Sequence, residues 1–202
     1  MRSFVRVGRF EVLFSSIALL AAILLLALVR CGRSPAPCDV VVSVFPLEQI
    51  AREIAGERLA IMSLLPPGAS PHTFEPRPAD IARVESARLV VRVGAGIDNW
   101  AERLLGEAKS EKRALILLAQ PPPELPEGGV PDPHIWLDPI RVRDSIVPAL
   151  AQAFSEIDPE GGRIYLERER RTKDLLSGLD RDIRKILSRA PGRRFISFHR
   201  AW

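Results

Sequence analysis

Short apolar runs that alternate with amphipathic stretches are the feature that most constrains the fold of this chain. Four runs rich in aliphatic and β-branched residues have the length of buried strands, and the stretches between them space their apolar residues as helices do. The predicted strands are residues 40–45, 58–65, 89–93 and 114–118. The predicted helices between them are residues 47–55, 79–86 and 99–108. This alternation is typical of right-handed crossover units, so we expect an α/β fold with a parallel four-stranded sheet covered by helices on both faces.

The loops that follow the predicted strands are where a ligand site is expected. In open parallel sheets, ligands bind in the crevice beyond the carboxyl ends of the strands. The loops in this position are residues 66–78, 94–98 and 120–139. The second of them contains the turn at residues 94–96, which lacks the third glycine of a dinucleotide-binding turn and a phosphate-binding lysine. The other two loops are therefore the better candidates for chemistry.

A long helix is predicted in the last third of the chain. A helical pattern at residues 139–154 precedes a much longer one at residues 162–190, whose apolar residues recur every three or four positions with charged residues between them. A coiled-coil partner can use such a stripe, but packing along the helix's own domain is the commoner cause. Pro191 and Gly192 end the helix, and residues 195–198 predict one more strand.

The predicted elements divide the chain into a first α/β lobe at residues 39–160, a linker helix at 161–191 and a short segment at 192–202. The strand at residues 195–198 has no sheet of its own before the sequence ends at residue 202. We expect it to be the first strand of a second α/β lobe that is missing from this sequence. A native end is the alternative, in which this strand pairs with the first sheet.

The first 31 residues predict a signal peptide or an N-terminal membrane anchor. Three arginines precede an apolar run at residues 12–29, whose length lies between that of a signal-peptide core and that of a membrane-spanning helix. Cys31 stands where a bacterial lipoprotein carries its lipidated cysteine, but an arginine precedes it instead of a small residue. Residues 32–38 have the composition of a tether, and Cys38 either pairs with Cys31 or both stay free. We expect an exported, periplasmic or extracytoplasmic protein that is tethered to the membrane.

The charge of the chain does not indicate a nucleic-acid partner. Its 29 basic residues are nearly balanced by 25 acidic residues that are interspersed with them. No cluster of arginines alternates with the aromatic side chains on which bases stack. We interpret the small positive net charge as a property of an ordinary protein surface, not as a sign of a particular partner.

Three histidines are the strongest functional signal, because His72, His134 and His199 each lie in or beside a loop where a strand's carboxyl end opens. Singly, each can be a loop residue without a function. Together they suit Zn²⁺, which binds neutral imidazole nitrogens at about 2.0–2.1 Å and often takes three of them with one oxygen ligand. Prolines surround His72 and flank His134, and they would lower the cost of ordering these loops around a metal ion.

Five segments carry a resemblance to a known family: residues 41–46, 64–76, 91–100, 133–139 and 195–202. Together they resemble the zinc- and manganese-binding proteins of bacterial ABC importers, over nearly all of residues 39–202. Such proteins have two α/β lobes joined by one long rigid helix, and they hold the metal between the lobes. The resemblance implies a monomeric substrate-binding protein, not an enzyme, which delivers its metal ion to a membrane permease. The predicted helix at residues 162–190 falls where the connecting helix is expected.

Carried over residue by residue, the resemblance makes His72 and His134 the two metal ligands of the first lobe and His199 the first ligand of the second. The family's fourth ligand is a carboxylate much later in the second lobe. Relatives selective for manganese usually carry glutamate at the third position, so His199 favours Zn²⁺, with Mn²⁺ as the alternative ion. Zinc-specific relatives often carry a histidine-rich loop before the second ligand, but residues 120–131 contain no histidine.

Three carboxylates lie close enough in sequence to orient an imidazole through its second nitrogen: Glu75, Asp132 and Asp138. Each also suits a turn or a helix cap, and an aspartate before a proline commonly starts a turn. We place none of them in the site.

Two other functions remain as alternatives. A zinc-dependent hydrolase can use three histidines and an open fourth position to activate water. It also needs a general base, and the helical His-Glu-x-x-His arrangement of zinc proteases is absent from this sequence. The other alternative is a surface adhesin, because relatives of the resembled family have been described as adhesins.

Overall fold

The computed structural model describes residues 38–107, 113–118, 132–190, 192, 196–197 and 199. The predicted signal peptide or anchor, nearly all of the tether and residues 119–131 lie outside the described residues. The pairing or lipidation of Cys31 therefore stays a prediction. Cys38 is described as a free, buried thiol.

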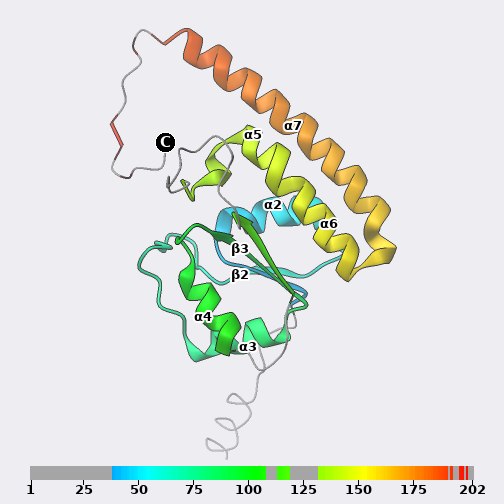
Figure 1. Ribbon diagram of the computed structural model, residues 1–202. Coiled ribbons are helices and arrows are strands. Elements are labelled where there is room, and N and C mark those ends of the chain that lie inside the picture. Colours follow the sequence, from blue (N-terminus) through cyan, green and yellow to red (C-terminus); the bar gives the residue numbers. More distant parts are fainter. Residues whose placement is uncertain are drawn as a thin grey trace, which may run out of the picture. The chain divides into compact units, whose positions relative to one another are not determined.

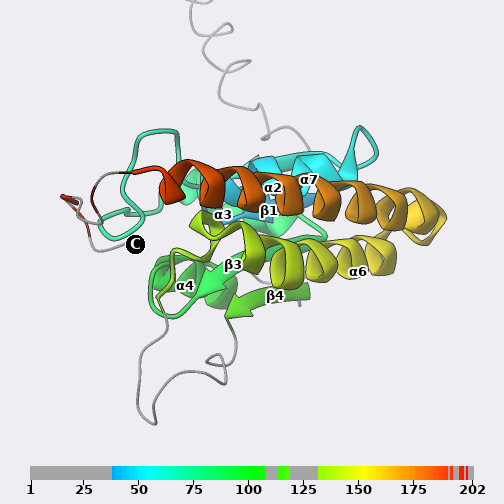
Figure 2. The same ribbon diagram turned by 90° about the horizontal axis from the view of Figure 1, so that it is seen from above.

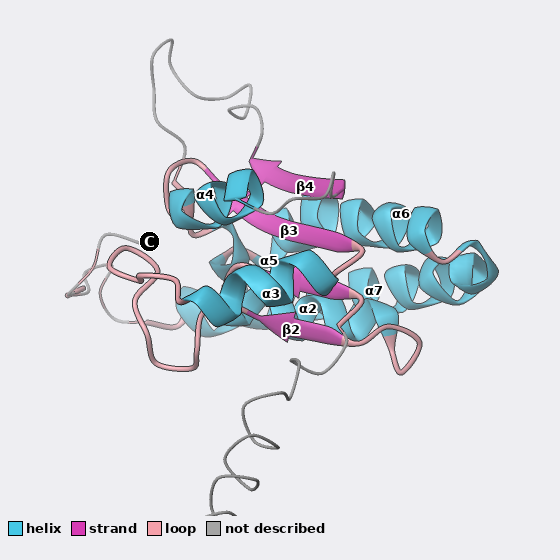
Figure 3. Cartoon of the chain, turned by 90° about the horizontal axis from the view of Figure 1, so that it is seen from below, coloured by secondary structure: helices cyan, strands magenta, loops and turns pink. Residues whose placement is uncertain are grey.

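Four parallel strands form the sheet: β1 (Val40–Val42), β2 (Ile61–Ser63), β3 (Leu89–Gly94) and β4 (Arg113–Leu118). Their order is β2-β1-β3-β4, so β1 and β3 are central in the described sheet (Figure 3). The chain passes from β1 to one neighbour and then to the other, and the topological switch point therefore lies between β1 and β3. The predicted α/β class with a parallel four-stranded sheet is confirmed.

Helices cover both faces of the sheet (Figure 1). On one face lie α2 (Phe45–Ala55), α6 (Val147–Ile157) and α7 (Gly162–Ser188), and on the other lie α3 (Pro78–Ser86) and α4 (Asn99–Glu107). The remaining short elements are η1 (Ile135–Leu137), α5 (Pro139–Arg141), η2 (Val142–Ile146) and η3 (Pro159–Gly161). Figure 2 shows α6 and α7 side by side, and α6 also contacts α2. These three helices form one packed layer.

The first two strands are shorter than predicted. Each has three residues, whereas six were expected for β1 and eight for β2. Pro46 lies in the first turn of α2, where its fixed φ suits a helix and its missing N–H leaves no bond unmade. Helix α2 therefore begins at Phe45, inside the predicted strand, and β1 ends at Val42.

Aliphatic side chains of the two central strands form the middle of the core. Val40, Val41 and Val42 are fully buried, and every residue of β3 is buried. Strands of a parallel sheet covered on both faces are expected to be apolar throughout. Burial of one such valine stabilises the fold by about 1.5–3 kcal/mol.

A charged cluster ties α6 and α7 to the loop before β2. Nε and Nη2 of Arg58 donate to the two carboxylate oxygens of Asp158 at 2.8 and 2.9 Å, and the Tyr165 hydroxyl donates to the same carboxylate. These bonds lower the pKa of Asp158 to about 2, while burial and the carboxylate raise the pKa of Tyr165 to about 12. A Cβ at Gly161 would clash with the side chains of Asp158, Arg58 and Tyr165, so glycine at this turn leaves room for the cluster.

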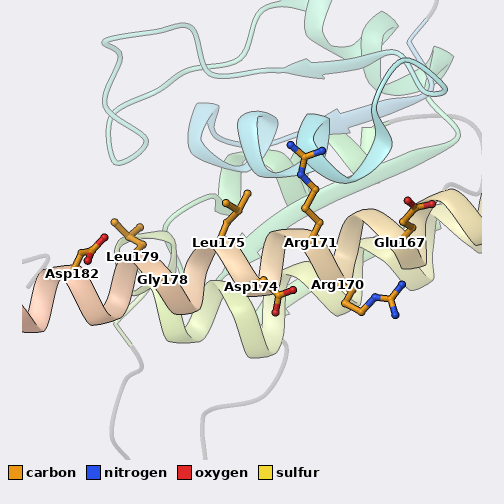
Figure 4. A pocket seen from close by; sticks show the side chains of 8 residues that line it. All are labelled: Glu167, Arg170, Arg171, Asp174, Leu175, Gly178, Leu179 and Asp182. Atoms are coloured by element: carbon orange, nitrogen blue, oxygen red, sulfur yellow. The ribbon is translucent and has the colours of Figure 1, made fainter.

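Helix α7 is the predicted long helix, but the prediction that its apolar stripe packs along its own domain is wrong for much of it. Tyr165 is fully buried and Leu176 packs against the core. The exposed large apolar residues of α7 are Ile164, Leu166, Leu175, Leu179, Ile183, Ile186 and Leu187. Length explains the exposure toward the far end of the helix, because α7 has 27 residues and its neighbour α6 has 11. Residues of both charges and two leucines line a hollow of about 690 Å³ on this helix (Figure 4).

The last described residues depart from the sequence-based expectation. Ile196 and Ser197 lie outside any strand, and the other two residues of the predicted strand at 195–198 are outside the described residues. Ile196 is 98% exposed, so it has no neighbouring strand or core to pack against. Within the described ranges, no helix is both long enough and apolar enough to cross a membrane.

Candidate metal centre

The three histidines meet at one point. His72 lies in the loop between β2 and α3, and His134 directly precedes η1. The Nε2 atom of His199 lies 2.9 Å from Nε2 of His134 and 3.3 Å from Nε2 of His72. One ligand nitrogen from each ring can be chosen so that all three lie within 4.8 Å of one another. The structure thus brings together all three histidines that were selected from the sequence.

The spacing of these nitrogens suits a metal ion of the size of zinc. In a tetrahedral shell with Zn–N distances of about 2.0–2.1 Å, neighbouring nitrogens are about 3.3 Å apart. The nitrogens of His72 and His199 have this separation, and those of His134 and His199 are a few tenths of an ångström closer. Imidazole donors suit Zn²⁺ and other transition metals rather than Mg²⁺ or Ca²⁺. Among the described residues three positions of the shell are provided, and no fourth donor belongs to the cluster.

A carboxylate orients His134. Oδ1 of Asp132 accepts from the ring Nδ1 of His134 at 2.7 Å and from its backbone N–H at 2.9 Å. A carboxylate only accepts, so Nδ1 carries a proton and the neutral ring presents the lone pair of Nε2 toward the other histidines. The ring also meets Trp136 edge to face, with centroids 5.4 Å apart. Both contacts restrict rotation of the imidazole, whose side chain is only 8% exposed.

The loop that carries His72 is held by α4. The indole N–H of Trp100 donates to the carbonyl of Pro71 at 3.0 Å, and Phe74 packs edge to face on the same indole with centroids 4.7 Å apart. His72 lies between these two attached residues, and its own side chain is exposed. The backbone on both sides of His72 is therefore fixed, although this loop belongs to no strand or helix.

The electrostatics of the cluster favour neutral imidazoles. Partial burial, followed by the nearby rings of His199 and His134, lowers the pKa of His72 below its usual 6.5. Partial burial raises the pKa of Asp132, but the hydrogen bonds it accepts from His134 outweigh this and leave its pKa below the usual 3.8. A neutral His72 and an ionised Asp132 are the states that metal binding requires.

The other carboxylates considered from the sequence have different places. Asp138 caps α5, because its Oδ1 accepts from the backbone N–H groups of Ile140 and Arg141. Glu75 is exposed and does not belong to the histidine cluster. Asp132, which the sequence did not place in the site, is the carboxylate that contacts a candidate ligand. Its only signal in the sequence is its position two residues before His134, with a proline between them.

Comparisons with known proteins agree with this geometry. Residues 40–202 match the family described as ZnuA, zinc-uptake complex component A, periplasmic. The iron-binding protein YfeA of Yersinia pestis is 30% identical over 75% of this chain and 50% of its own length. The high-affinity zinc uptake system protein ZnuA of Bacillus subtilis is 25% identical over 81% of this chain and 56% of its own length.

A solved structure shows the same fold. A crystal structure of ZnuA superimposes with a TM-score of 0.72 and 30% sequence identity, and the match covers 82% of this chain and 64% of that one. The chain spans about half the length of the curated relatives it matches. The comparison therefore covers part of each relative.

Proposed function

The chain belongs to the ZnuA family of zinc-uptake proteins, and from this premise we propose that it binds Zn²⁺ through His72, His134 and His199 as the substrate-binding part of a metal importer. The observation that carries the proposal is the approach of three Nε2 atoms from segments far apart in sequence. Each ring presents its Nε2 atom to a shared point. Zinc is the cargo of this site, not a cofactor for a reaction.

The metal preference follows from the donor set. Three imidazole nitrogens form a softer shell than the carboxylates and waters that suit Mn²⁺, so zinc is the better-matched ion. The family relatives differ in the metal for which they are named: the Yersinia pestis relative is an iron-binding protein and the Bacillus subtilis relative a zinc-uptake protein. His199 is the donor that favours a preference for Zn²⁺ in this chain, with Mn²⁺ as the weaker alternative.

The importer role requires a membrane partner. We propose that the protein acts outside the cytoplasm, captures the ion and transfers it to an ABC permease, with residues 1–31 serving for export or anchoring. The family match and the names of the relatives support this role. The two relatives named above do not favour the adhesin alternative, because their names refer to iron binding and zinc uptake.

The hydrolase alternative is the main competitor, since an open fourth position can hold a water molecule. Such an enzyme needs a base beside that water. Asp132 accepts two hydrogen bonds from His134 and contacts Nδ1, on the ring edge away from Nε2. It is therefore poorly placed to take a proton from water at the shared point, and we propose a binding function without catalysis.

Zinc titration of the chain and of single His→Ala variants tests the proposal. A competing chromophoric chelator should report one zinc per wild-type chain. Zinc sites of four ligands have apparent binding free energies of about 10–16 kcal/mol, so each ligand accounts for roughly a quarter of that value. Loss of any one histidine should therefore weaken binding by about 100-fold. Glu167→Gln, on the surface of α7, is the control and should bind as the wild type does.

Two results would contradict the proposal. One is a wild-type chain that binds no zinc, and the other is a set of histidine variants with unchanged affinity. Ester or amide turnover by the zinc-loaded wild type, lost in the same variants, would favour the hydrolase.

A further inference from the structure

We propose that Trp100 is a positioning residue for zinc binding, which holds His72 at the metal centre before the ion arrives. This role rests on the proposed function, because it matters only if His72 is a ligand. In the described part of the chain, the polar and ring contacts of Trp100 are with Pro71 and Phe74, not with an imidazole of the cluster. It acts on the backbone beside the ligand.

The indole holds the His72 loop at two points. Its N–H donates to the carbonyl of Pro71, the residue before His72, and its ring meets Phe74, two residues after it. Trp100 itself is 4% exposed, whereas His72 and Thr73 are exposed. The loop segment that carries the ligand is thus a surface bridge between two attachments to one buried side chain.

The attachment is rigid because α4 is fixed to the central strand β3. The carboxylate of Asp98 accepts from the backbone N–H groups of Val93 and Gly94 at 2.6 and 3.0 Å. Its carbonyl accepts from the N–H of Ala101, in the first turn of α4. Asp98 is fully buried, so these bonds are shielded from water. Trp100 is the second residue of the helix that begins here.

The loop needs such an attachment because of where it starts. It leaves β2, which is separated from β3 by β1, so two strand spacings or about 10 Å lie between β2 and the strand that precedes Trp100. Residues 64–77 form no strand or helix along this path. Without the indole contacts, binding zinc would also have to order this loop, and the cost would appear as weaker affinity.

Trp100→Phe tests the role, since it removes the N–H donor and keeps an aromatic ring for Phe74. We expect the dissociation constant for Zn²⁺, measured by chelator competition on the 202-residue chain, to rise about threefold to tenfold, as expected for one net hydrogen bond. Tyr165→Phe is the matched control. It also removes one donor from a buried aromatic residue, but its hydroxyl contacts Asp158 at the α6–α7 junction, and its zinc affinity should stay at the wild-type value.

A double-mutant cycle separates positioning from general destabilisation. If Trp100 acts through His72, Trp100→Phe should weaken zinc binding in the wild type but cause no further loss in a His72→Ala background. In a His134→Ala background the threefold to tenfold loss should persist. Should Trp100→Phe not fold, as judged by circular dichroism, Phe74→Leu tests the second attachment in the same cycle, with the same pattern expected.

The outcomes are distinct. Wild-type affinity in the Trp100→Phe variant, or an equal loss with and without His72, overturns the positioning role. The proposed function survives that result as long as the wild type binds zinc and the histidine variants bind it about 100-fold more weakly. A wild-type chain that binds no zinc overturns both.

Discussion

Replacement of Asp132 by alanine should weaken zinc binding by about 10- to 100-fold, the range found when a partner of a ligating histidine is lost. The structure shows why, because one carboxylate oxygen accepts from both the ring Nδ1 and the backbone N–H of His134. Without it, the ring can rotate and can exchange the proton between its two nitrogens. The expected change corresponds to about 1.4–2.7 kcal/mol of binding free energy.

Asp132→Asn divides this effect into two parts. The amide keeps an oxygen that can accept from Nδ1–H, but it carries no charge. Charge-assisted hydrogen bonds are about twice as strong as neutral ones, so the amide should retain roughly half of the stabilisation and lose about threefold to tenfold in affinity. The lowered pKa of Asp132 means that the wild-type carboxylate is ionised throughout the neutral range.

Competition against a chromophoric chelator at pH 7.5 measures these affinities, and Asp138→Ala is the matched control. Asp138 also lies beside a proline near His134, but it caps α5 instead of contacting a ring. Its loss should lower the free energy of unfolding by about 1 kcal/mol without changing zinc affinity. The reasoning fails if Asp132→Ala binds zinc within twofold of the wild type, or if Asp138→Ala loses as much affinity.

Three further predictions concern pH and packing. Zinc affinity should fall by on the order of tenfold or more between pH 7.5 and 5.5, because protons compete for imidazoles whose ordinary pKa is near 6.5; titrations that give equal affinity at both values would exclude imidazole ligation. The Asp158 carboxylate has a folded pKa of about 2 against 3.8 when unperturbed, so it stabilises the fold fully above the unperturbed pKa and loses this contribution as the pH falls toward 2. Urea unfolding at pH 5 and 2.5 should therefore show a smaller loss of unfolding free energy with acid in Asp158→Asn than in the wild type. Equal losses in the two proteins would contradict the stabilising role of the ionised Asp158. Leu150→Ala should cost about 2–5 kcal/mol of unfolding free energy because the side chain is fully buried, whereas Leu179→Ala, 49% exposed, should cost far less; equal losses in thermal or chemical unfolding would show that the exposed face of α7 is covered in solution.

The fold class could be predicted from the sequence because it depends on local patterns. The valines of β1 and the aliphatic run of β3 indicate strands buried on both faces, and the helical spacing between them indicates crossovers. The strand order could not be predicted, since parallel strands of similar composition give no signal of which neighbours pair. The end of β1 was also missed, because the apolar residues Val44 and Phe45 suit either a strand or the start of α2.

The candidate site was predictable only for its ligands. Three histidines in a chain of 202 residues are conspicuous, and imidazole has a well-defined coordination chemistry. Asp132 was ambiguous, because an aspartate before a proline is at least as common in turns as beside a metal ligand. The contact between Trp100 and Pro71 joins residues 29 apart and depends on the packing of α4 against the loop, so no local pattern announces it.

His72 and His134 meet although the strands before them are far apart. β2 and β4 are the outer strands of the described sheet, three strand spacings or about 14 Å apart. His72 and His134 follow these strands in the chain, yet with His199 they offer ligand nitrogens that lie within 4.8 Å of one another. Parallel sheets of this type bind ligands at the switch point between their central strands. It follows that the site depends on how each ligand is held by its own neighbours, and less on the strand that precedes it. Side chains such as Trp100 and Asp132, which supply no ligand atom, then decide how much of the zinc-binding free energy remains after the loops are ordered.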